Sequence, residues 1–203
     1  MKRIAVAVAL ALATSLSACL FRARPDAFRY YTLASSAEPA VKSASGLTVG
    51  LGPVTLPGYL SRPGLATRVG DTQVHYAEGD LWAEPLAKQF TRTLSEDLSR
   101  ALGGARIVDY PWYPGVPVDV AVVVTVLTFE VDSTGTATLN ASWMLRDPLS
   151  RQNGHEGQSA IVEPAGAVPG EARGDAAVAA LSRALDRLAR EIAVAIVADT
   201  HHR

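Results

Sequence analysis

Cysteine is nearly absent from the sequence: Cys19 is the only one, so no disulfide can form within the chain and stability must come from a packed core. The G-x-S-x-G elbow of serine hydrolases and the Walker loop of nucleotide-binding proteins are both missing. Gly50 and Gly52 begin a G-x-G pattern, but Thr55 occupies the place of the third glycine. A dinucleotide-binding fingerprint is therefore excluded.

Candidate metal ligands and paired carboxylates are also scarce. Among the four histidines only His201 and His202 are close together, at a polar end that we interpret as a frayed tail rather than a metal site. Glu96 and Asp97 are adjacent carboxylates, and we expect them on the solvated face of an amphipathic helix. These patterns give no support to an enzyme.

The composition is that of a folded protein. Of the 203 residues, 48% are hydrophobic and 19% are charged, which excludes a disordered chain and is enough for one domain. The 19 basic and 20 acidic side chains nearly balance, and loss of a leader carrying Lys2 and Arg3 leaves a small negative excess. A mildly acidic protein argues against nucleic acid or an anionic membrane surface as the main partner.

The start of the chain has the pattern of an exported precursor. Lys2 and Arg3 precede an apolar run over 4–13 that is too short to span a bilayer. Leu16-Ser17-Ala18-Cys19 follows and resembles the bacterial lipobox, in which the cysteine sulfur receives a diacylglyceryl group, the leader is removed and the new amino terminus is acylated. An ordinary signal peptide is the alternative, but it leaves a lone thiol in an oxidising compartment.

We therefore expect a signal peptide over 1–18, a lipidated tether over 19–27 that begins at Cys19, and a folded domain over 28–203. Two or more acyl chains hold a protein stably on a membrane, whereas one chain binds reversibly.

Strand patterns dominate the domain. Alternating or β-branched segments predict strands over 28–33, 47–54, 67–69, 72–76, 105–110, 118–131, 137–145 and 155–162. Gly70-Asp71 predicts a two-residue hairpin turn, and the prolines and glycines of 53–64 predict an irregular loop. The almost continuously apolar run over 118–131 predicts a central strand that is buried on both faces.

Two amphipathic helices are expected. Apolar residues at four-residue spacing from Trp82 onward predict a helix within 81–102. Pro85 suits only the first turn, so the helix proper is expected to begin at about Ala83 or Glu84. A second helix runs from about Asp175, its N-cap, to about Asp199. The predicted fold is α/β, a single-domain sandwich with a mixed, mostly antiparallel sheet, one parallel crossover, and both long helices on one side.

Aromatic side chains next to loops are the candidates for binding. Trp82 is expected in the core, because it lies on the apolar stripe. The segment 110–115 packs three aromatics among prolines, and for Trp112 and Tyr113 core packing and an exposed contact surface are equally open. Trp and Tyr are favoured at interface hot spots, so Tyr110, Trp112 and Tyr113 are the candidate partner-binding residues.

Taken in order, several segments resemble one known family. They are the aromatic strand 28–33, the stretch VGLGPVTLPGYL over 49–60, a hairpin ending His75-Tyr76, the LWAEPL stretch over 81–86, and a strand closing on Tyr110-Pro111-Trp112. Together with the lipobox they are similar to the PqiC (YmbA) lipoproteins, also called ABC-type transport auxiliary lipoproteins. Trp82, Glu84 and Pro85 form the most specific motif.

The resemblance implies a non-enzymatic lipoprotein that faces the periplasm and serves as auxiliary or tethering subunit of an MCE-type ABC lipid transport system, supporting membrane integrity. Its partners would be an MCE-domain protein, the membrane through its lipid, and further copies of itself, in this branch a ring. The expected modification is the N-acyl and S-diacylglycerol lipid on Cys19, with no other cofactor. Leu20 follows Cys19 in place of a retention-signalling aspartate, which implies the outer rather than the inner membrane.

Two other functions stay open at this point. One is a periplasmic carrier that holds a lipid or small amphiphile in its own apolar cavity. The other is a periplasmic hydrolase, which would need His75, Asp80 and Ser61 to converge in one cleft.

Overall fold

The computed structural model describes residues 28–41, 44, 46–112, 115–148, 153–165 and 173–200. The expected signal peptide and tether, including Cys19, lie outside the described residues, as do Tyr113, His201 and His202.

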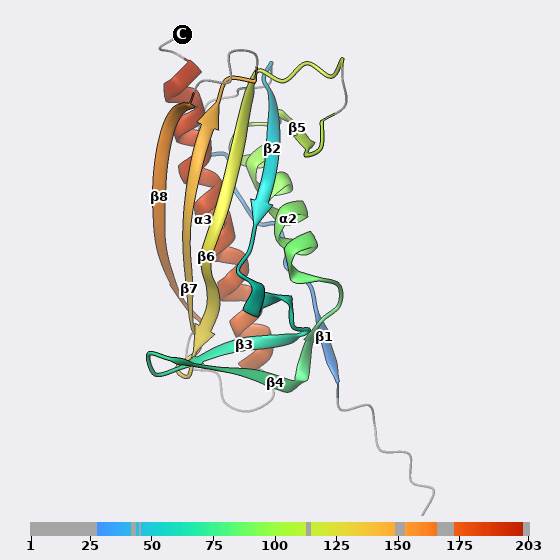
Figure 1. The fold of residues 1–203 in the computed structure, drawn as a ribbon, viewed down its shortest axis with the longest axis vertical. Coiled ribbons are helices and arrows are strands. Elements are labelled where there is room, and N and C mark those ends of the chain that lie inside the picture. The colour runs from blue at the N-terminus through green and yellow to red at the C-terminus, as the bar shows by residue number, and fades with distance from the viewer. Residues whose placement is uncertain are drawn as a thin grey trace, which may run out of the picture.

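Strands and two long helices alternate along the described chain (Figure 1). In order, the elements are β1 (Arg29–Tyr31), β2 (Thr48–Thr55), the short 3-10 helix η1 (Gly58–Ser61), β3 (Gly64–Val69), β4 (Gln73–Trp82), α2 (Leu86–Ala101), β5 (Arg106–Asp109), β6 (Val120–Asp132), β7 (Thr136–Arg146), β8 (Asn153–Pro164) and α3 (Arg173–Thr200). The positions of the predicted strands and helices are confirmed in outline.

All eight strands belong to one mixed sheet. Its order is β1-β4-β3-β6-β2-β5, and β7 and β8 continue from the other side of β6. The antiparallel ladders β6–β7 and β7–β8 are the longest, whereas β1–β4, β2–β5, β2–β6 and β3–β6 are short parallel pairs. The mixed sheet confirms the prediction, although parallel pairing is more frequent than the one expected crossover.

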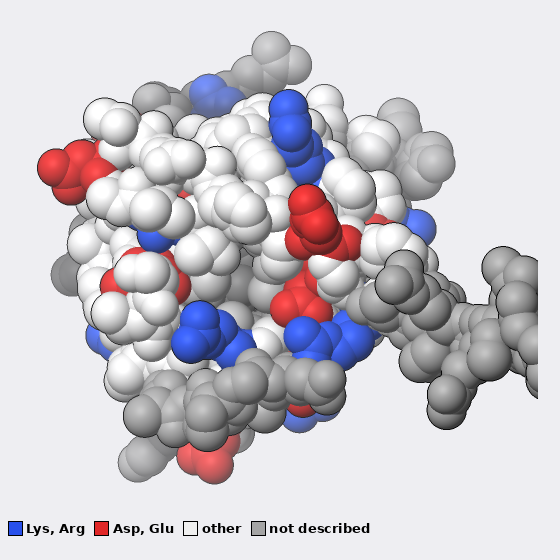
Figure 2. All heavy atoms as spheres, turned by 90° about the horizontal axis from the view of Figure 1, so that it is seen from below, with Lys and Arg blue, Asp and Glu red and all other residues white. Residues whose placement is uncertain are grey.

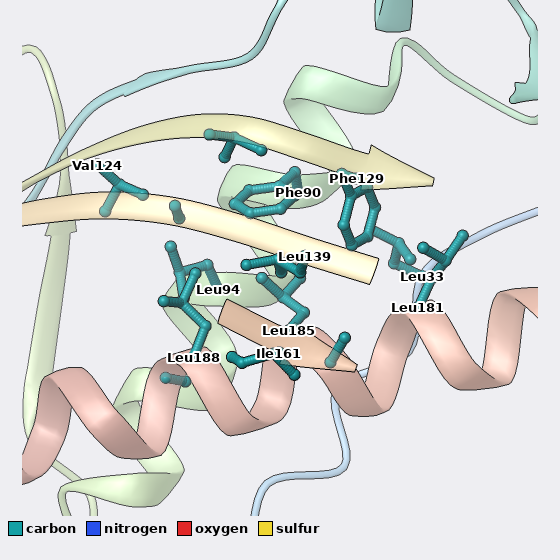
Figure 3. Packing of buried hydrophobic residues seen from close by; sticks show 14 of the residues in the cluster. Leu33, Phe90, Leu94, Val124, Phe129, Leu139, Ile161, Leu181, Leu185 and Leu188 are labelled. Carbon is teal, nitrogen blue, oxygen red and sulfur yellow. The ribbon is translucent and has the colours of Figure 1, made fainter. Parts of the chain in front are cut away.

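Both long helices cover the same face of this sheet, as predicted (Figure 1). α2 packs near β2 and β5, and α3 packs across β6, β7 and β8. The core lies between these layers (Figure 3). Phe90 of α2 meets Phe129 of β6 edge to face, with ring centroids 5.1 Å apart, and Leu139, Ile161 and Leu185 pack around them without solvent exposure.

The other face of the sheet carries neither of the two long helices. On β6, Val122 and Val124 face the helices and are fully buried, but Thr125 is exposed and Leu127 is 60% exposed. The prediction that this strand is buried on both faces is therefore wrong along its middle. The physical reason is that α2 and α3 both lie on one side, so no long helix covers the middle of the strand on the other. We call this uncovered side the open face.

The first helix begins later than predicted. Trp82 ends β4, where its backbone N–H donates to the Pro63 carbonyl at 2.7 Å, and the helix starts only at Leu86. Pro85 is the N-cap residue, with φ −51° and ψ 125°, outside the helical region. The residue before a proline avoids the helical region, so Glu84 is disfavoured as a helical residue and the helix starts after Pro85. Trp82 is buried in the core as expected, but from a strand rather than from the helical stripe.

The β3–β4 hairpin also departs from the prediction. Val69 pairs with Gln73, so the turn holds three residues rather than two. The segment 53–64 is less irregular than expected, since β2 continues to Thr55 and η1 forms one turn within it.

An extended segment, residues 32–41, crosses the helices on the covered side, and we call it the N-terminal strap. Asp97 of α2 accepts three hydrogen bonds from it at a single carboxylate oxygen: from the Ser35 hydroxyl at 2.6 Å and from the backbone N–H groups of Ser36 and Ala37. Asp97 is fully buried, which corrects the prediction of a solvated carboxylate pair. Burial raises the pKa of Asp97. The hydrogen bonds from the strap act to lower this pKa, and the charge of the nearby Asp186 acts to raise it.

Of the helices that the structure describes, neither α2 nor α3 combines the length and apolarity needed to cross a membrane.

Candidate functional site

The predicted aromatic segment lies on the open face, at the end of β5. β5 pairs in parallel with β2, and the backbone N–H of Tyr110 donates to the Leu51 carbonyl at 2.8 Å, which extends this pairing by one residue. Val49 and Leu51 of β2 point into the core, so Gly50 and Gly52 between them face the other way. The aromatic side chains therefore meet a part of the sheet that has no side chains of its own.

Two glycines make room for these rings. A Cβ atom on Gly50 would lie 2.6 Å from Cε2 of Trp112 and 2.9 Å from Cγ1 of Val118. A Cβ atom on Gly52, whose φ is +118°, would lie 2.7 Å from Cβ of Tyr110. Distances this short are not tolerated between carbon atoms, so glycine is required for the close approach.

Trp112 is an anchor of this segment and Tyr110 is its exposed side chain. The indole Nε1 of Trp112 donates to the Val108 carbonyl at 3.0 Å, and its ring meets the Tyr110 ring edge to face at 5.6 Å. Trp112 is partly buried, whereas Tyr110 is 55% exposed. Of the two residues for which packing and exposure were both open, Trp112 is fixed by packing and Tyr113 lies outside the described residues. Tyr110 is the aromatic side chain exposed for contact.

A hollow of about 530 Å³ adjoins the two aromatic rings. Its lining includes Gly52, Pro53, Tyr110, Trp112, Val123 and Arg146. Asp147 lines it as well, so aromatic and apolar walls stand beside charged groups of both signs. Such a depression suits a protruding side chain of a protein partner.

The open face continues away from this hollow along β6, β7 and β8. A second depression of about 300 Å³ shares Val123 with the first and is bordered by Thr125, Ser142 and Gln158. Leu127 and Val162 are exposed beyond it, at 60% and 55%. The candidate surface is therefore one end of a broad uncovered sheet rather than an isolated loop.

Trp82, Glu84 and Pro85, the most specific motif of the sequence, each have a structural role. Trp82 is buried at the end of β4, and Pro85 caps α2. The Glu84 carboxylate accepts a hydrogen bond from Arg92 at 2.7 Å and lies 3.5 Å from the Lys88 ammonium. This arrangement fixes the passage from strand to helix and leaves none of the three at the candidate surface.

The residues proposed for a hydrolase do not converge. His75 and Asp80 line one hollow at the β3–β4 end, but the Asp80 carboxylate accepts a hydrogen bond from Arg29 at 2.7 Å. Ser61 is elsewhere, on η1, and its hydroxyl donates to the Gly58 carbonyl. Within the described ranges, no three His, Cys, Asp or Glu side chains gather in a way that could hold a metal ion.

A buried ionic cluster that the sequence did not indicate lies beneath η1. Arg68 donates two hydrogen bonds to the Glu130 carboxylate, at 2.6 and 3.1 Å, and Glu130 is 4% exposed. Burial, together with the neighbouring Glu130, raises the pKa of Tyr59 to about 12, so its phenol stays protonated. The cluster joins η1 and β3 to β6 and is structural, because both charges are matched within it.

The sequence of this chain is similar to that of known transport lipoproteins. The family model described as "ABC-type transport auxiliary lipoprotein component" matches residues 31–193. The intermembrane transport lipoproteins PqiC of Escherichia coli K12 and of Shigella flexneri are each 30% identical to this chain over 136 residues. These matches span 64% of this chain and 64% of the length of each relative.

Solved structures show the same fold. A protein from Xanthomonas campestris superposes with a TM-score of 0.70 at 16% identity, covering 86% of this chain and 97% of its own. A second, uncharacterised protein superposes with a TM-score of 0.66 at 24% identity, covering 82% and 97%. With the family model spanning β1 to α3, the chain belongs to the ABC-type transport auxiliary lipoprotein components.

Proposed function

We propose that this protein is a non-enzymatic subunit of an MCE-type ABC lipid transport system that connects the inner and outer membranes and supports membrane integrity. A lipid on Cys19 holds it at the periplasmic side of the outer membrane. The lipobox before Cys19 and the membership of the transport auxiliary lipoprotein family support this proposal. The PqiC relatives are themselves named intermembrane transport lipoproteins.

The observation that carries the proposal is the exposed Tyr110 beside its hollow on the open face. A subunit without catalytic groups acts by holding a partner, and holding requires an exposed anchor in a rigid setting. Trp112, packed over Gly50 and bonded to Val108, supplies that rigidity, so little conformational entropy is lost on binding. We assign docking of the MCE-domain protein to this surface.

Docking is favoured over carriage of a lipid inside the domain. The space between the sheet and the helices is filled by side chains that are fully buried, among them Phe90, Leu94, Leu139 and Leu185 (Figure 3). An acyl chain would have to displace them, and close-packed cores resist such displacement.

The copies of this subunit are also proposed to assemble into a ring. Sedimentation of the purified lipoprotein in detergent measures it, and a monomeric mass would exclude the ring.

Membrane fractionation and co-purification test the function directly. The wild-type protein is expected to float with outer membranes after a high-salt wash and to capture an MCE-domain protein. The Cys19→Ala variant is expected not to associate with membranes, and the Leu20→Asp variant is expected to be found in the inner membrane. A Cys19→Ala protein that still floats would contradict the anchor, and failure to capture any MCE-domain protein would contradict the partner.

A further inference from the structure

Two aromatic side chains, one in β1 and one directly before it, lie in solvent at one end of the molecule. This short strand is the edge of the sheet in the strand order and lies at the lower end in Figure 1, together with the β3–β4 hairpin. Tyr31 points into the core, and Arg29 pairs with Asp80 at 2.7 Å. Phe28 and Tyr30 alternate with them and are 49% and 62% exposed.

We propose that Phe28 and Tyr30 insert into the interfacial layer of the bilayer that holds the lipid anchor, and so fix the orientation of the domain on the membrane. This inference rests on the proposed lipidation of Cys19. It adds a second membrane contact, made by the folded domain itself.

The length of chain between the anchor and β1 supports this occupant. Residues 19–27 number nine, and nine residues reach at most about 30 Å when fully extended. The strand therefore lies within about 30 Å of the anchored residue. The effective concentration of bilayer surface is then of millimolar order, so even a weak contact is occupied.

The chemistry of the pair also fits an interface. Tyr has an apolar ring with a polar hydroxyl at its tip, and aromatic side chains gather where hydrocarbon meets headgroups. The large apolar side chains exposed on β6, β8 and α3 are aliphatic instead: Leu127, Val162 and Val194. The aromatic pair is thus next to the tether, where a membrane contact is useful.

The charges around β1 indicate which kind of contact this is. Figure 2 looks at this end and shows side chains of both signs around a hollow, whose lining includes Arg29, His75, Asp80, Asp132 and Arg173. Mixed charges provide no net attraction for anionic lipid. The contact is therefore apolar insertion, and high salt should leave it intact.

Insertion here would have a consequence for the partner surface. β1 and β5 are at opposite ends of the strand order, and Figure 1 places β5 toward the other end of the molecule. A domain held by β1 therefore keeps Tyr110 away from the bilayer, where a periplasmic partner can reach it.

Spin-label depth measurements test the inference on the full lipoprotein in phosphatidylcholine vesicles. The lipid occupies the sulfur of Cys19, so Tyr30→Cys and, separately, Phe28→Cys each provide one thiol for a nitroxide label. Leu127→Cys and Val194→Cys are matched controls, because both positions are about as exposed. Labels at 28 and 30 are expected to be more accessible to oxygen than to a water-soluble nickel chelate, in low and high salt, with the opposite order at both controls.

Several results would overturn the inference. Equal accessibilities at all four positions, or loss of the difference in high salt, would show that β1 is not inserted. Dipolar broadening between labels at position 30 on neighbouring copies would assign this strand to a protein contact instead. A wild-type protein that accepts the label at Cys19 and fails to float would instead contradict the proposed lipidation, which separates the two failures.

Discussion

The two faces of the sheet differ in how they are used. On the helix-covered face, β6 contributes Val122 and Val124 to a core without solvent exposure, whereas one residue further along, Thr125 is exposed on the open face. Because side chains alternate along a strand, the same strands supply both surfaces. The covered face accounts for stability, and the open face is the one to which we assign partner binding.

The open face is organised by small residues and the covered face by large ones. Gly50 and Gly52 alternate along β2 with Val49 and Leu51, which are fully buried under the helices. Gly50 admits Trp112 and Gly52 admits Tyr110 close to the sheet, so the segment after β5 covers a small area of it. Exposure of Tyr110 follows from that limited cover.

The largest expected effect contrasts two neighbours on β6. Val124→Asp buries a charge against the helices and should cost about 4 kcal/mol or more of the free energy of unfolding. Thr125→Asp puts the same side chain into solvent on the open face and should cost under about 1 kcal/mol. Thermal melts of both variants measure this, and equal shifts would mean that the faces have been assigned wrongly.

The next effect concerns the polar contacts of the covered side. Asp97→Ala removes the acceptor of three hydrogen bonds from the N-terminal strap and should cost about 3 kcal/mol. Its exposed neighbour supplies the control, since Glu96→Ala should change stability by under about 0.5 kcal/mol. Denaturant unfolding compares the two. A small loss of stability in Asp97→Ala would show that other contacts hold the N-terminal strap.

The same carboxylate predicts a pH dependence. Burial raises the pKa of Asp97 above its ordinary 3.8, so the folded state binds a proton more readily than the unfolded state. Its stabilising contribution is complete below 3.8 and is lost as the pH rises through the raised pKa. Relative to Asp97→Asn, the wild type should therefore gain melting temperature between about pH 7 and about pH 4. A difference in melting temperature between the two proteins that does not change with pH would contradict the raised pKa of Asp97.

A smaller effect tests the glycine contact on the open face. Gly50→Ala forces Trp112 or Val118 to move and should cost about 1–3 kcal/mol. A Cβ atom on Gly58 meets nothing within 4 Å, so Gly58→Ala is the control and should be nearly neutral. In a Trp112→Ala background the cost of Gly50→Ala should shrink, and a double-mutant cycle measures that coupling. If the destabilisations of the two single variants simply add, the Trp112 ring does not contact Gly50.

Much of the fold could be predicted from the sequence, because periodic apolar residues mark which side of an element is buried. The stripe of α3, from Val178 to Ile196, is buried as expected. The start of α2 was misplaced because Trp82 and Leu86 are four residues apart across a strand–helix boundary, which imitates helical spacing. Asp97 was misjudged by residue type, although it lies three residues after Leu94 and four before Ala101 on the buried stripe.

The candidate site was predicted only in part. Prolines and aromatics drew attention to the segment around Tyr110 and Trp112. Which ring packs and which is exposed depends on the pairing of β2 with β5, a contact between segments more than 50 residues apart that local patterns do not encode. Glycines alternating with apolar residues in a strand were the available signal for a close approach at Gly50.

Affinity for the proposed MCE-domain partner tests the central claim most directly, with Tyr110→Ala compared with Val194→Ala, an equally exposed change on α3. Loss of a true anchor costs about 2 kcal/mol, or about thirtyfold in affinity. We predict that Tyr110→Ala weakens binding about thirtyfold while its melting temperature stays close to wild type, because only one edge-to-face ring contact is lost. Val194→Ala should bind as wild type. Unchanged binding by Tyr110→Ala would contradict the assignment of the open face as the partner surface.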